Sequence, residues 1–201
     1  MGMPSLSILL HEIVKLLYYA GCKDVVMIRI GTSGGIGVAA GTVVVTETAV
    51  NEMLKPQYDV VILGNTVSRE TELDKKLMED LLKSKQEGDQ FEVVKGKTMS
   101  ASDFYECQGR LDGAVCEYTE DDKMAYLKKA EEIGVRNIEM EATCFAAMCK
   151  KVGIPGAVVC VTLLNRLKGD QVSTPKDELK AMEMHPQKIV SRYIKNKLSK
   201  L

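Results

Sequence analysis

The sequence predicts an α/β domain with a mostly parallel central sheet and helices on both of its faces. Two observations support this fold class. Segments with strand-like and helix-like patterns alternate along the chain, and neither an internal repeat nor a low-complexity linker divides them. A chain of 201 residues with 45% hydrophobic content can also bury a substantial core. We therefore expect residues 1–201 to form a single domain.

Each element follows from a local pattern. A helix is expected from Pro4 to Tyr19, because leucine and isoleucine recur there at helical spacing, and Gly21 closes it. Further helices are expected at 71–85, from a cap at Thr119 to about 133, at 142–151, and after Pro186, which suits a first helical turn. Apolar runs predict strands at 25–30, 42–46, 60–63, 91–94, 135–138 and 157–163.

Charge and composition narrow the class of function. The chain has 27 basic and 28 acidic residues, so it carries no electrostatic footprint for a nucleic acid. No apolar run approaches the roughly 20 residues of a membrane span. The opening stretch 6–19 contains His11, Glu12 and Lys15, which makes it a poor signal peptide. We expect a cytoplasmic protein that acts on small molecules, without a membrane or nucleic-acid partner.

The six cysteines stand at irregular spacings, without a C-x-x-C pair or a neighbouring histidine cluster. This pattern argues against a zinc site and against a secreted disulfide framework. We therefore expect no bound metal.

The segment Arg-Ile-Gly-Thr-Ser-Gly-Gly at 29–35 ends an apolar run with a cation and a glycine-rich turn. A cation beside free backbone N–H groups suits an oxyanion. The segment lacks the lysine of a P-loop and the spacing of a dinucleotide fingerprint. It could also be a plain turn, with Arg29 as a surface or ion-pairing residue.

The segment Asp-Phe-Tyr-Glu-Cys-Gln-Gly-Arg at 103–110 places an aromatic ring, an amide and a guanidinium within seven residues. Phe104, Gln108 and Arg110 together could hold a planar heterocycle with carbonyl and imide edges. The alternatives are a core position for Phe104 and a solvated loop for the two polar residues.

The segment Ile-Glu-Met-Glu at 138–141 sets two carboxylates around Met140. Such a group suits a sugar, whose diol would meet a carboxylate while its ring packs on the methionine. Glu139 and Glu141 could instead only favour the start of the following helix through its dipole. Arg29 with Thr32, the two glutamates, and Asn165 with Arg166 all follow predicted strands, so three strand ends could meet at one pocket.

Longer stretches carry a family resemblance. They are Met-Pro-Ser-Leu-Ser-Ile (3–8), Arg-Ile-Gly-Thr-Ser-Gly-Gly-Ile-Gly (29–37), Asp-Phe-Tyr-Glu-x-Gln-Gly-Arg-Leu-Asp-Gly-Ala (103–114), Gly-Val-Arg-Asn-Ile-Glu-Met-Glu (134–141), Phe-Ala-Ala-Met (145–148) and Val-Cys-Val-Thr-Leu-Leu-Asn-Arg (159–166). Along its whole length the chain resembles the animal-type uridine phosphorylases of the nucleoside phosphorylase family. The resemblance implies a three-layer α/β fold and reversible cleavage of uridine by phosphate to uracil and ribose 1-phosphate. It implies no cofactor and no catalytic metal.

The resemblance also implies roles for individual residues. Arg29, Thr32 and the backbone at Gly31 would bind phosphate, with Thr32 also near the substrate. Phe104 would stack on the base, whose edge Gln108 and Arg110 would hold. The remaining contacts would be Met140 against the ribose, Glu141 with Glu139 beside its hydroxyls, Leu163 and Leu164 near uracil C5, and Arg166 supporting Arg110 or a water. Arg29, Gln108, Arg110 and Glu141 would carry the catalysis, which needs no proton-transfer residue.

The chain departs from the family pattern in two places. The family has an amino-terminal section before the segment that begins here as Met-Gly-Met-Pro-Ser. That section carries phosphate-binding residues and residues that reach the partner's site in a homodimer. We therefore expect missing first strands, free sheet edges, a depleted phosphate site and weak turnover by this chain alone. Cys107 stands where animal members usually have glycine, and we expect its Cβ to shift the loop of Gln108.

Three other functions remain in view. Purine nucleoside cleavage is disfavoured, because relatives with that activity carry an aspartate where this chain has Asn165 and Arg166. A non-catalytic nucleoside-binding chain that associates with full-length enzyme is the second reading. The third, a nicotinamide-dependent oxidoreductase, lacks a G-x-G-x-x-G motif.

Overall fold

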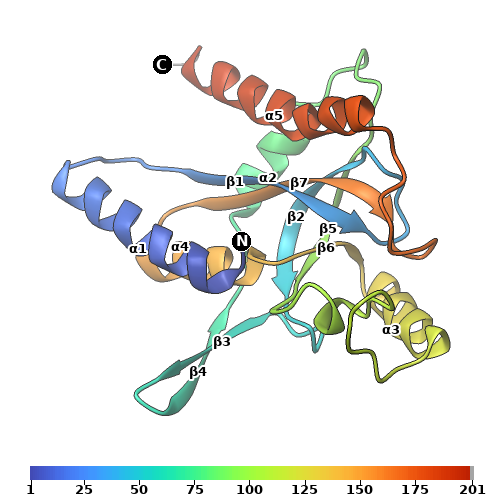
Figure 1. The fold of residues 1–201 in the computed structure, drawn as a ribbon. Coiled ribbons are helices and arrows are strands. Elements are labelled where there is room, and N and C mark those ends of the chain that lie inside the picture. The colour runs from blue at the N-terminus through green and yellow to red at the C-terminus, as the bar shows by residue number, and fades with distance from the viewer. Residues whose placement is uncertain (200–201) are drawn as a thin grey trace.

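A computed structural model describes residues 1–199, which fold around a mixed sheet of five strands (Figure 1). The strands are β1 (Met27–Gly35), β2 (Val43–Val50), β3 (Gln57–Ile62), β4 (Asn65–Glu70), β5 (Val93–Ser100), β6 (Val135–Glu139) and β7 (Gly156–Asn165). The helices are α1 (Met3–Tyr19), α2 (Lys75–Leu82), α3 (Glu120–Glu132), α4 (Ala142–Val152) and α5 (Lys176–Leu198), with a short 3₁₀ helix at Glu106–Gln108.

The sheet has the order β1-β6-β5-β2-β7 and closes on itself as a barrel, while β3 and β4 form a separate hairpin. Three of its pairings are parallel (β1–β7, β2–β5, β5–β6) and two are antiparallel (β1–β6, β2–β7). The predicted mixed, mostly parallel sheet is therefore confirmed. The expectation of free edges holds only in part, because Gly34 and Gly35 pair with β6 and close the ring. Within the described chain, residues 27–33 of β1 pair with β7 alone.

Helices cover the sheet on both sides (Figure 1). On one side α2 and α5 pack on β2 and β7 through the fully buried Leu81 and Ile189. On the other side α1 and α4 share a second cluster around Leu10 and Phe145. The third helix packs Leu127 against β5 and β6. No helix within residues 1–199 is both long and apolar enough to cross a membrane.

Most predicted elements are present, with instructive exceptions. Thr119 begins α3 through a reciprocal capping box with Asp122, as its sequence indicates. Helix α2 starts later than predicted, because the Asp74 carboxylate accepts a hydrogen bond from Leu77 N–H and ends the preceding loop. The predicted start of the last helix at Pro186 is wrong. Helix α5 begins ten residues earlier and keeps Pro186 buried inside it, so packing outweighs the backbone hydrogen bond lost there.

Candidate active site

A cavity of about 540 Å³ brings together every residue that the sequence singles out as a binding residue. This volume is typical of small-molecule sites. The predicted residues that line it are Arg29, Gly31, Thr32, Phe104, Gln108, Arg110, Glu139, Met140, Glu141, Leu163, Leu164 and Arg166. They come from β1, the end of β6, the end of β7 and the loop that contains the 3₁₀ helix. Segments that are far apart in sequence therefore share one cavity.

The segment 29–35 is a strand and not the glycine-rich turn that its composition suggests. Its backbone at Gly31 to Ser33 runs in register with β7, so its N–H groups do not form a turn around an anion. The glycines instead leave room for arginine side chains. A Cβ on Gly31 would lie 3.1 Å from Arg29 Nη1, and a Cβ on Gly34 would lie 3.0 Å from Arg166 Cγ.

Strand direction explains why Arg29 meets the two glutamates. Arg29 lies within β1 and not at its carboxyl end, which corrects the picture of three converging strand ends. Since β6 runs antiparallel to β1, with Ile138 opposite Gly34, the chain beyond Ile138 runs back towards Arg29. Arg29 Nη2 lies 2.9 Å from Glu139 Oε2 and also donates a hydrogen bond to Glu141 Oε2.

The two glutamates have different surroundings. Glu139 is buried, and its carboxylate accepts hydrogen bonds from the N–H groups of Glu141 (3.0 Å) and Ala142 (2.8 Å) at the start of α4. Of the two roles considered for the glutamates, Glu139 therefore has the structural one, in which a carboxylate stabilises the start of the following helix. Glu141 is more accessible and accepts a hydrogen bond from Gly2 N–H at 2.5 Å. Glu141 is thus the carboxylate better placed to meet a ligand.

The ion pair lies in a desolvated environment. Burial of Arg29 opposes its charge, but Glu139, Cys160 and Glu141 outweigh this and hold the pKa of the guanidinium above its ordinary value. Burial raises the pKa of Glu139, although Arg29 opposes the rise. Behind them, Cys160 Sγ accepts a hydrogen bond from Arg29 Nη1 at 3.3 Å, and burial raises the pKa of this thiol to about 12. Arg29 therefore stays positively charged, and the neighbouring Cys160 thiol stays protonated.

The second polar group of the cavity surrounds Phe104, whose half-exposed ring has the Arg110 guanidinium 4.5 Å from its centroid. Two nitrogens of Arg110 bind Asp112, through Nε to Oδ1 at 2.8 Å and Nη2 to Oδ2 at 2.6 Å. This hydrogen bonding by Arg110 holds the pKa of Asp112 below its ordinary value. The guanidinium is therefore fixed in orientation, and within residues 1–199 its Nη1 atom makes no hydrogen bond to the protein.

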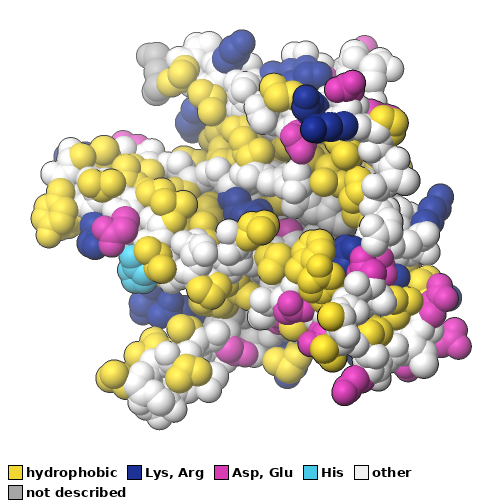
Figure 2. Space-filling model, in the orientation of Figure 1, with side chains coloured by type: hydrophobic (Ala, Val, Ile, Leu, Met, Phe, Trp, Pro, Cys, Tyr) yellow, Lys and Arg dark blue, Asp and Glu magenta, His cyan; other side chains and the backbone are white. Residues whose placement is uncertain are grey.

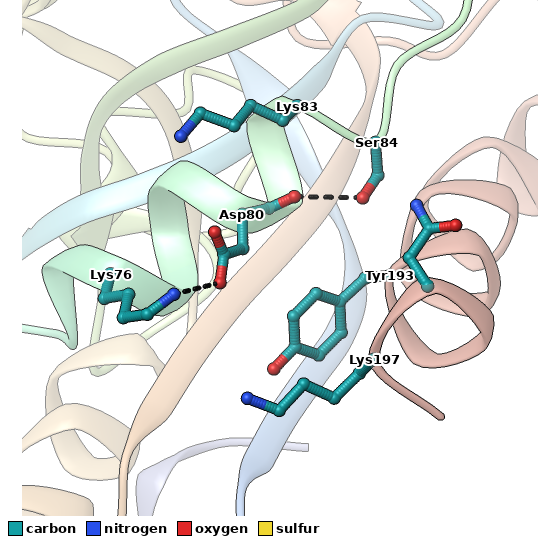
Figure 3. Close-up of a pocket in the computed structure, with 7 residues that line it drawn as sticks. Lys76, Asp80, Lys83, Ser84, Tyr193 and Lys197 are labelled. Carbon is teal, nitrogen blue, oxygen red and sulfur yellow. Dashed lines mark hydrogen bonds and ion pairs between the residues drawn. The ribbon is translucent and has the colours of Figure 1, made fainter. Parts of the chain in front are cut away.

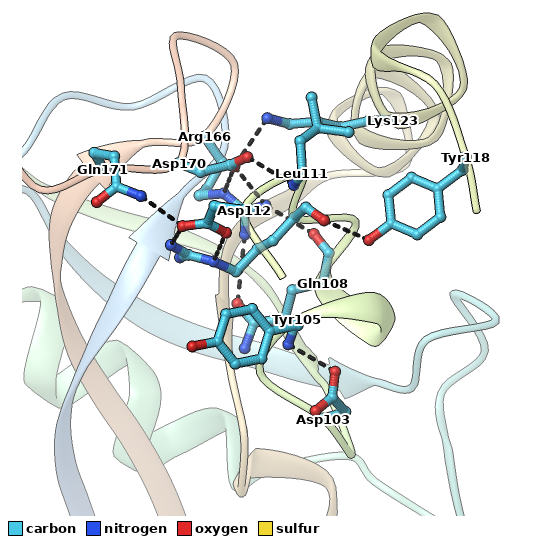
Figure 4. Close-up of polar contacts among 11 residues, drawn as sticks. Asp103, Tyr105, Gln108, Leu111, Asp112, Tyr118, Lys123, Arg166, Asp170 and Gln171 are labelled. Carbon is cyan, nitrogen blue, oxygen red and sulfur yellow. Dashed lines mark hydrogen bonds and ion pairs between the residues drawn. The ribbon is translucent and has the colours of Figure 1, made fainter. Parts of the chain in front are cut away.

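Arg166 contacts Gln108 and not Arg110, so the first of the two roles expected for it, support of Arg110, is not seen (Figure 4). Its Nη2 donates to the Gln108 carbonyl oxygen at 2.8 Å, and its Nη1 lies 3.4 Å from Gln108 Oε1. The side chain is fully buried, so its charge needs a partner, which is Asp170.

Several residues near the site were not among the binding residues expected from the sequence. Helix α1 contributes Ser5, Leu6 and Leu9 to the cavity wall, although its periodicity indicates only a helix with an apolar face. Lys123 and Asp170 form a buried ion pair beside the site, and neither lies in a recognisable motif. With Arg110, Arg166 and Asp112 they make a cluster of three cations and two carboxylates, which carries one net positive charge.

Other side chains complete the wall. Met140, Leu163 and Leu164 are partly buried and provide apolar surface, and Thr32 is exposed. In the part of the chain that the structure describes, no group of three or more His, Cys, Asp or Glu side chains is arranged to hold a metal ion.

Known proteins are similar to this chain in fold and in sequence. The model of the phosphorylase superfamily matches residues 1–195. Uridine phosphorylase 1 of Mus musculus is 52% identical over 200 residues, which are 100% of this chain and 64% of that protein. The chain thus spans less than two thirds of the length of the mouse relative.

A solved structure and a second relative extend the comparison. The uridine phosphorylase of Schistosoma mansoni in complex with uracil has a TM-score of 0.94 and 46% identity, covering 98% of this chain and 68% of that one. The inactive uridine phosphorylase B of Schistosoma mansoni is 44% identical over 195 residues, covering 96% of this chain and 66% of that protein. The chain therefore belongs to the phosphorylase superfamily and, within it, to the uridine phosphorylase family.

Proposed function

We propose that this protein cleaves uridine with phosphate, giving uracil and ribose 1-phosphate, in pyrimidine nucleoside salvage. The observation that carries the proposal is the gathering of all the predicted binding residues around one cavity of nucleoside-compatible size. Uridine, uracil, phosphate and ribose 1-phosphate are the proposed ligands. The proposed reaction uses no cofactor and no metal.

The base is proposed to lie against Phe104 with its polar edge towards Gln108 and Arg110. An Arg166 nitrogen can only donate, so it orients Gln108 Oε1 towards itself and leaves the amide Nε2 as a donor to a carbonyl of the base. Arg110 Nη1 is a second donor to the same edge. Leu163 and Leu164 form the apolar surface that faces the C5 side.

The sugar and phosphate are proposed to lie at the Arg29 end. Met140 packs on the ribose, and Glu141 accepts hydrogen bonds from its hydroxyls. Arg29 already holds Glu141, so it can bridge that carboxylate and a phosphate oxygen, with Thr32 as a further donor. Glu139 supports Arg29 without contacting the ligand, because its carboxylate already binds the N–H groups at the start of α4 and the Arg29 guanidinium.

The chemistry follows from these charges. Cleavage of the N-glycosidic bond puts positive character on the sugar and negative charge on the departing base. Glu141 faces the positive character on the sugar. The net positive cluster around Arg110 and Arg166 faces the negative charge on the base. Fixed donors at a developing charge can accelerate such a step without a proton-transfer residue.

We also propose that the protein works as a homodimer whose sites take residues from both subunits. Apolar side chains are exposed on α1 and at the tip of the β3–β4 hairpin, on the left of Figure 2. They include Leu16 (69%), Tyr19 (83%) and Leu63 (96%). Exposed apolar patches of this kind favour association. Sedimentation should give twice the mass of the chain.

The test is phosphate-dependent release of uracil from uridine by the purified protein, with inosine as the control substrate. Uracil release that requires phosphate, without hypoxanthine release from inosine, is expected. Uracil binding without turnover would instead establish the non-catalytic alternative, which the existence of an inactive relative keeps in view. Absence of both binding and turnover would refute the proposal.

A further inference from the structure

The Asp170 carboxylate joins three separate segments of the chain. It accepts hydrogen bonds from Lys123 Nζ on α3 (2.8 Å), from the Leu111 N–H group (3.1 Å) and from Arg166 Nε (3.0 Å), as Figure 4 shows. The side chains of Asp170 and Lys123 are only 9% and 5% exposed. A carboxylate that has left water this completely is stabilised by such donors, and each donor in turn depends on it.

The contacts continue to the residue that is proposed to read the base. Arg166 binds Asp170 with one side of its guanidinium and the Gln108 carbonyl and amide oxygens with the other. A continuous path therefore runs from Lys123 through Asp170 and Arg166 to Gln108. Neither Lys123 nor Asp170 lines the cavity.

The path crosses two irregular segments, one between β5 and α3 and one between β7 and α5. The first carries Gln108 and Arg110, and the second carries Arg166. Loops of this kind are mobile unless they are tied down. A second tie lies beside the first, because Gln171 Nε2 donates to Asp112 at 2.5 Å and Asp112 holds Arg110. The two loops are thus clamped to each other at the point where both meet the base pocket.

We infer that Asp170, with Lys123 behind it, is a positioning residue that fixes Gln108 and the Leu111 backbone for recognition of a planar imide edge. Neither residue touches the ligand. The identity of that ligand rests on the proposed function, whereas the clamp itself does not. Desolvation by itself raises the pKa of Asp170. The hydrogen bonds from Lys123 and Leu111 and the charge of Arg166 reverse this, so the pKa stays below its ordinary value and the clamp stays charged.

The test uses Asp170→Asn, which keeps the volume of the side chain and removes its charge. Affinities for uracil and for ribose 1-phosphate are measured by calorimetry, and hydrogen exchange is followed at the Leu111 amide. We expect uracil affinity to fall roughly ten-fold or more, because displaced donors cost affinity steeply. Ribose 1-phosphate affinity should stay within about two-fold, and Leu111 should exchange faster by roughly ten-fold.

Three further variants make the result specific. Asp80→Asn is the matched control, because Asp80 accepts from Lys76 Nζ at the same 2.8 Å in an open groove between α2 and α5 (Figure 3). This control should change neither ligand affinity. Lys123→Met removes one of the three donor groups and should weaken uracil binding in the same direction but less. Lys123→Met also tests the inference if Asp170→Asn does not fold. Lys123→Arg keeps a cation at this position, so it should keep the uracil affinity of the unaltered protein.

Failure of the clamp and failure of the proposed function give different results. If the unaltered protein does not bind uracil, the proposed function is wrong, and Leu111 exchange alone then decides the clamp. If uracil affinity and Leu111 exchange match those of the unaltered protein in both Asp170→Asn and Lys123→Met, the inference is overturned. Equal losses for uracil and ribose 1-phosphate also overturn it, because they indicate a general structural role.

Discussion

Replacement of Arg29 by methionine isolates the buried charge of Glu139. Methionine keeps much of the volume of the arginine stem, but it leaves a carboxylate that is 2% exposed without its cation. Breaking a buried pair in this way costs about 3–5 kcal/mol of the free energy of unfolding. We expect about 3 kcal/mol, at the low end, because Arg29 is itself 15% exposed and Glu139 keeps two backbone donors.

The measurement is thermal unfolding. At this chain length about 3 kcal/mol corresponds to a fall in Tm of roughly 6–12 °C. Lys95→Met is the matched control, because Lys95 pairs with Glu47 at 3.3 Å on the surface, and it should cost less than about 1 kcal/mol. An unchanged Tm in Arg29→Met would refute the reasoning.

The pH dependence gives a second check on the same variant. Burial raises the pKa of Glu139 in the folded protein, so the folded state binds its proton more tightly than the unfolded state. The contribution of Glu139 to the free energy of unfolding is present below its unfolded pKa of about 4.3. It is lost as the pH rises through the pKa of the folded protein. Without Arg29 the pKa rises further, so the deficit of Arg29→Met should be smaller at pH 5 than at pH 8. Glu139→Gln added to Arg29→Met should remove this dependence, and a deficit independent of pH would contradict the assignment.

Three other predictions concern the ligand and a helix end. Gln108→Leu should weaken uridine binding roughly 5- to 150-fold in calorimetry, because a polar group of the ligand stays unpaired at a cost of ~1–3 kcal/mol; an unchanged affinity would remove Gln108 from the site. Glu141→Ala should weaken uridine more than free uracil, whereas equal losses would indicate a folding defect. Thr119→Ala should lower the free energy of unfolding by about 1 kcal/mol in denaturant titration, since it removes the cap of α3, and no change would mean that the cap contributes nothing.

The sequence was a good guide where the signal is local. Helical periodicity located α1 and α4 almost to the residue, and the cap at Thr119 located the start of α3. Strands such as β5 run past their predicted ends, because polar and small residues continue the pairing once a neighbouring strand is present. The polar hairpin strand β4 was missed for the same reason, since its exposed residues carry no apolar run.

The candidate site divides in the same way. The kinds of side chain were readable from three motifs, because a cation, an aromatic ring with an amide, and paired carboxylates each imply a chemistry on their own. The contact partners of these side chains could not be predicted from the sequence. Gly31 and Gly34 suggested a turn, but their small size serves the arginine side chains that pass over them, one of which lies far away in sequence.

The sequence by itself therefore determined the residues that line the candidate cavity, most of the helices and strands, and the family. Only the tertiary structure decided which charges meet. Arg29 reaches Glu139 because β6 runs antiparallel to β1, and Asp170 reaches Lys123 because two loops fold onto α3. Contacts of this kind depend on strand order and direction, which are set by the packing of the whole chain. Local periodicity and composition reflect only neighbouring residues, so they leave such pairings open.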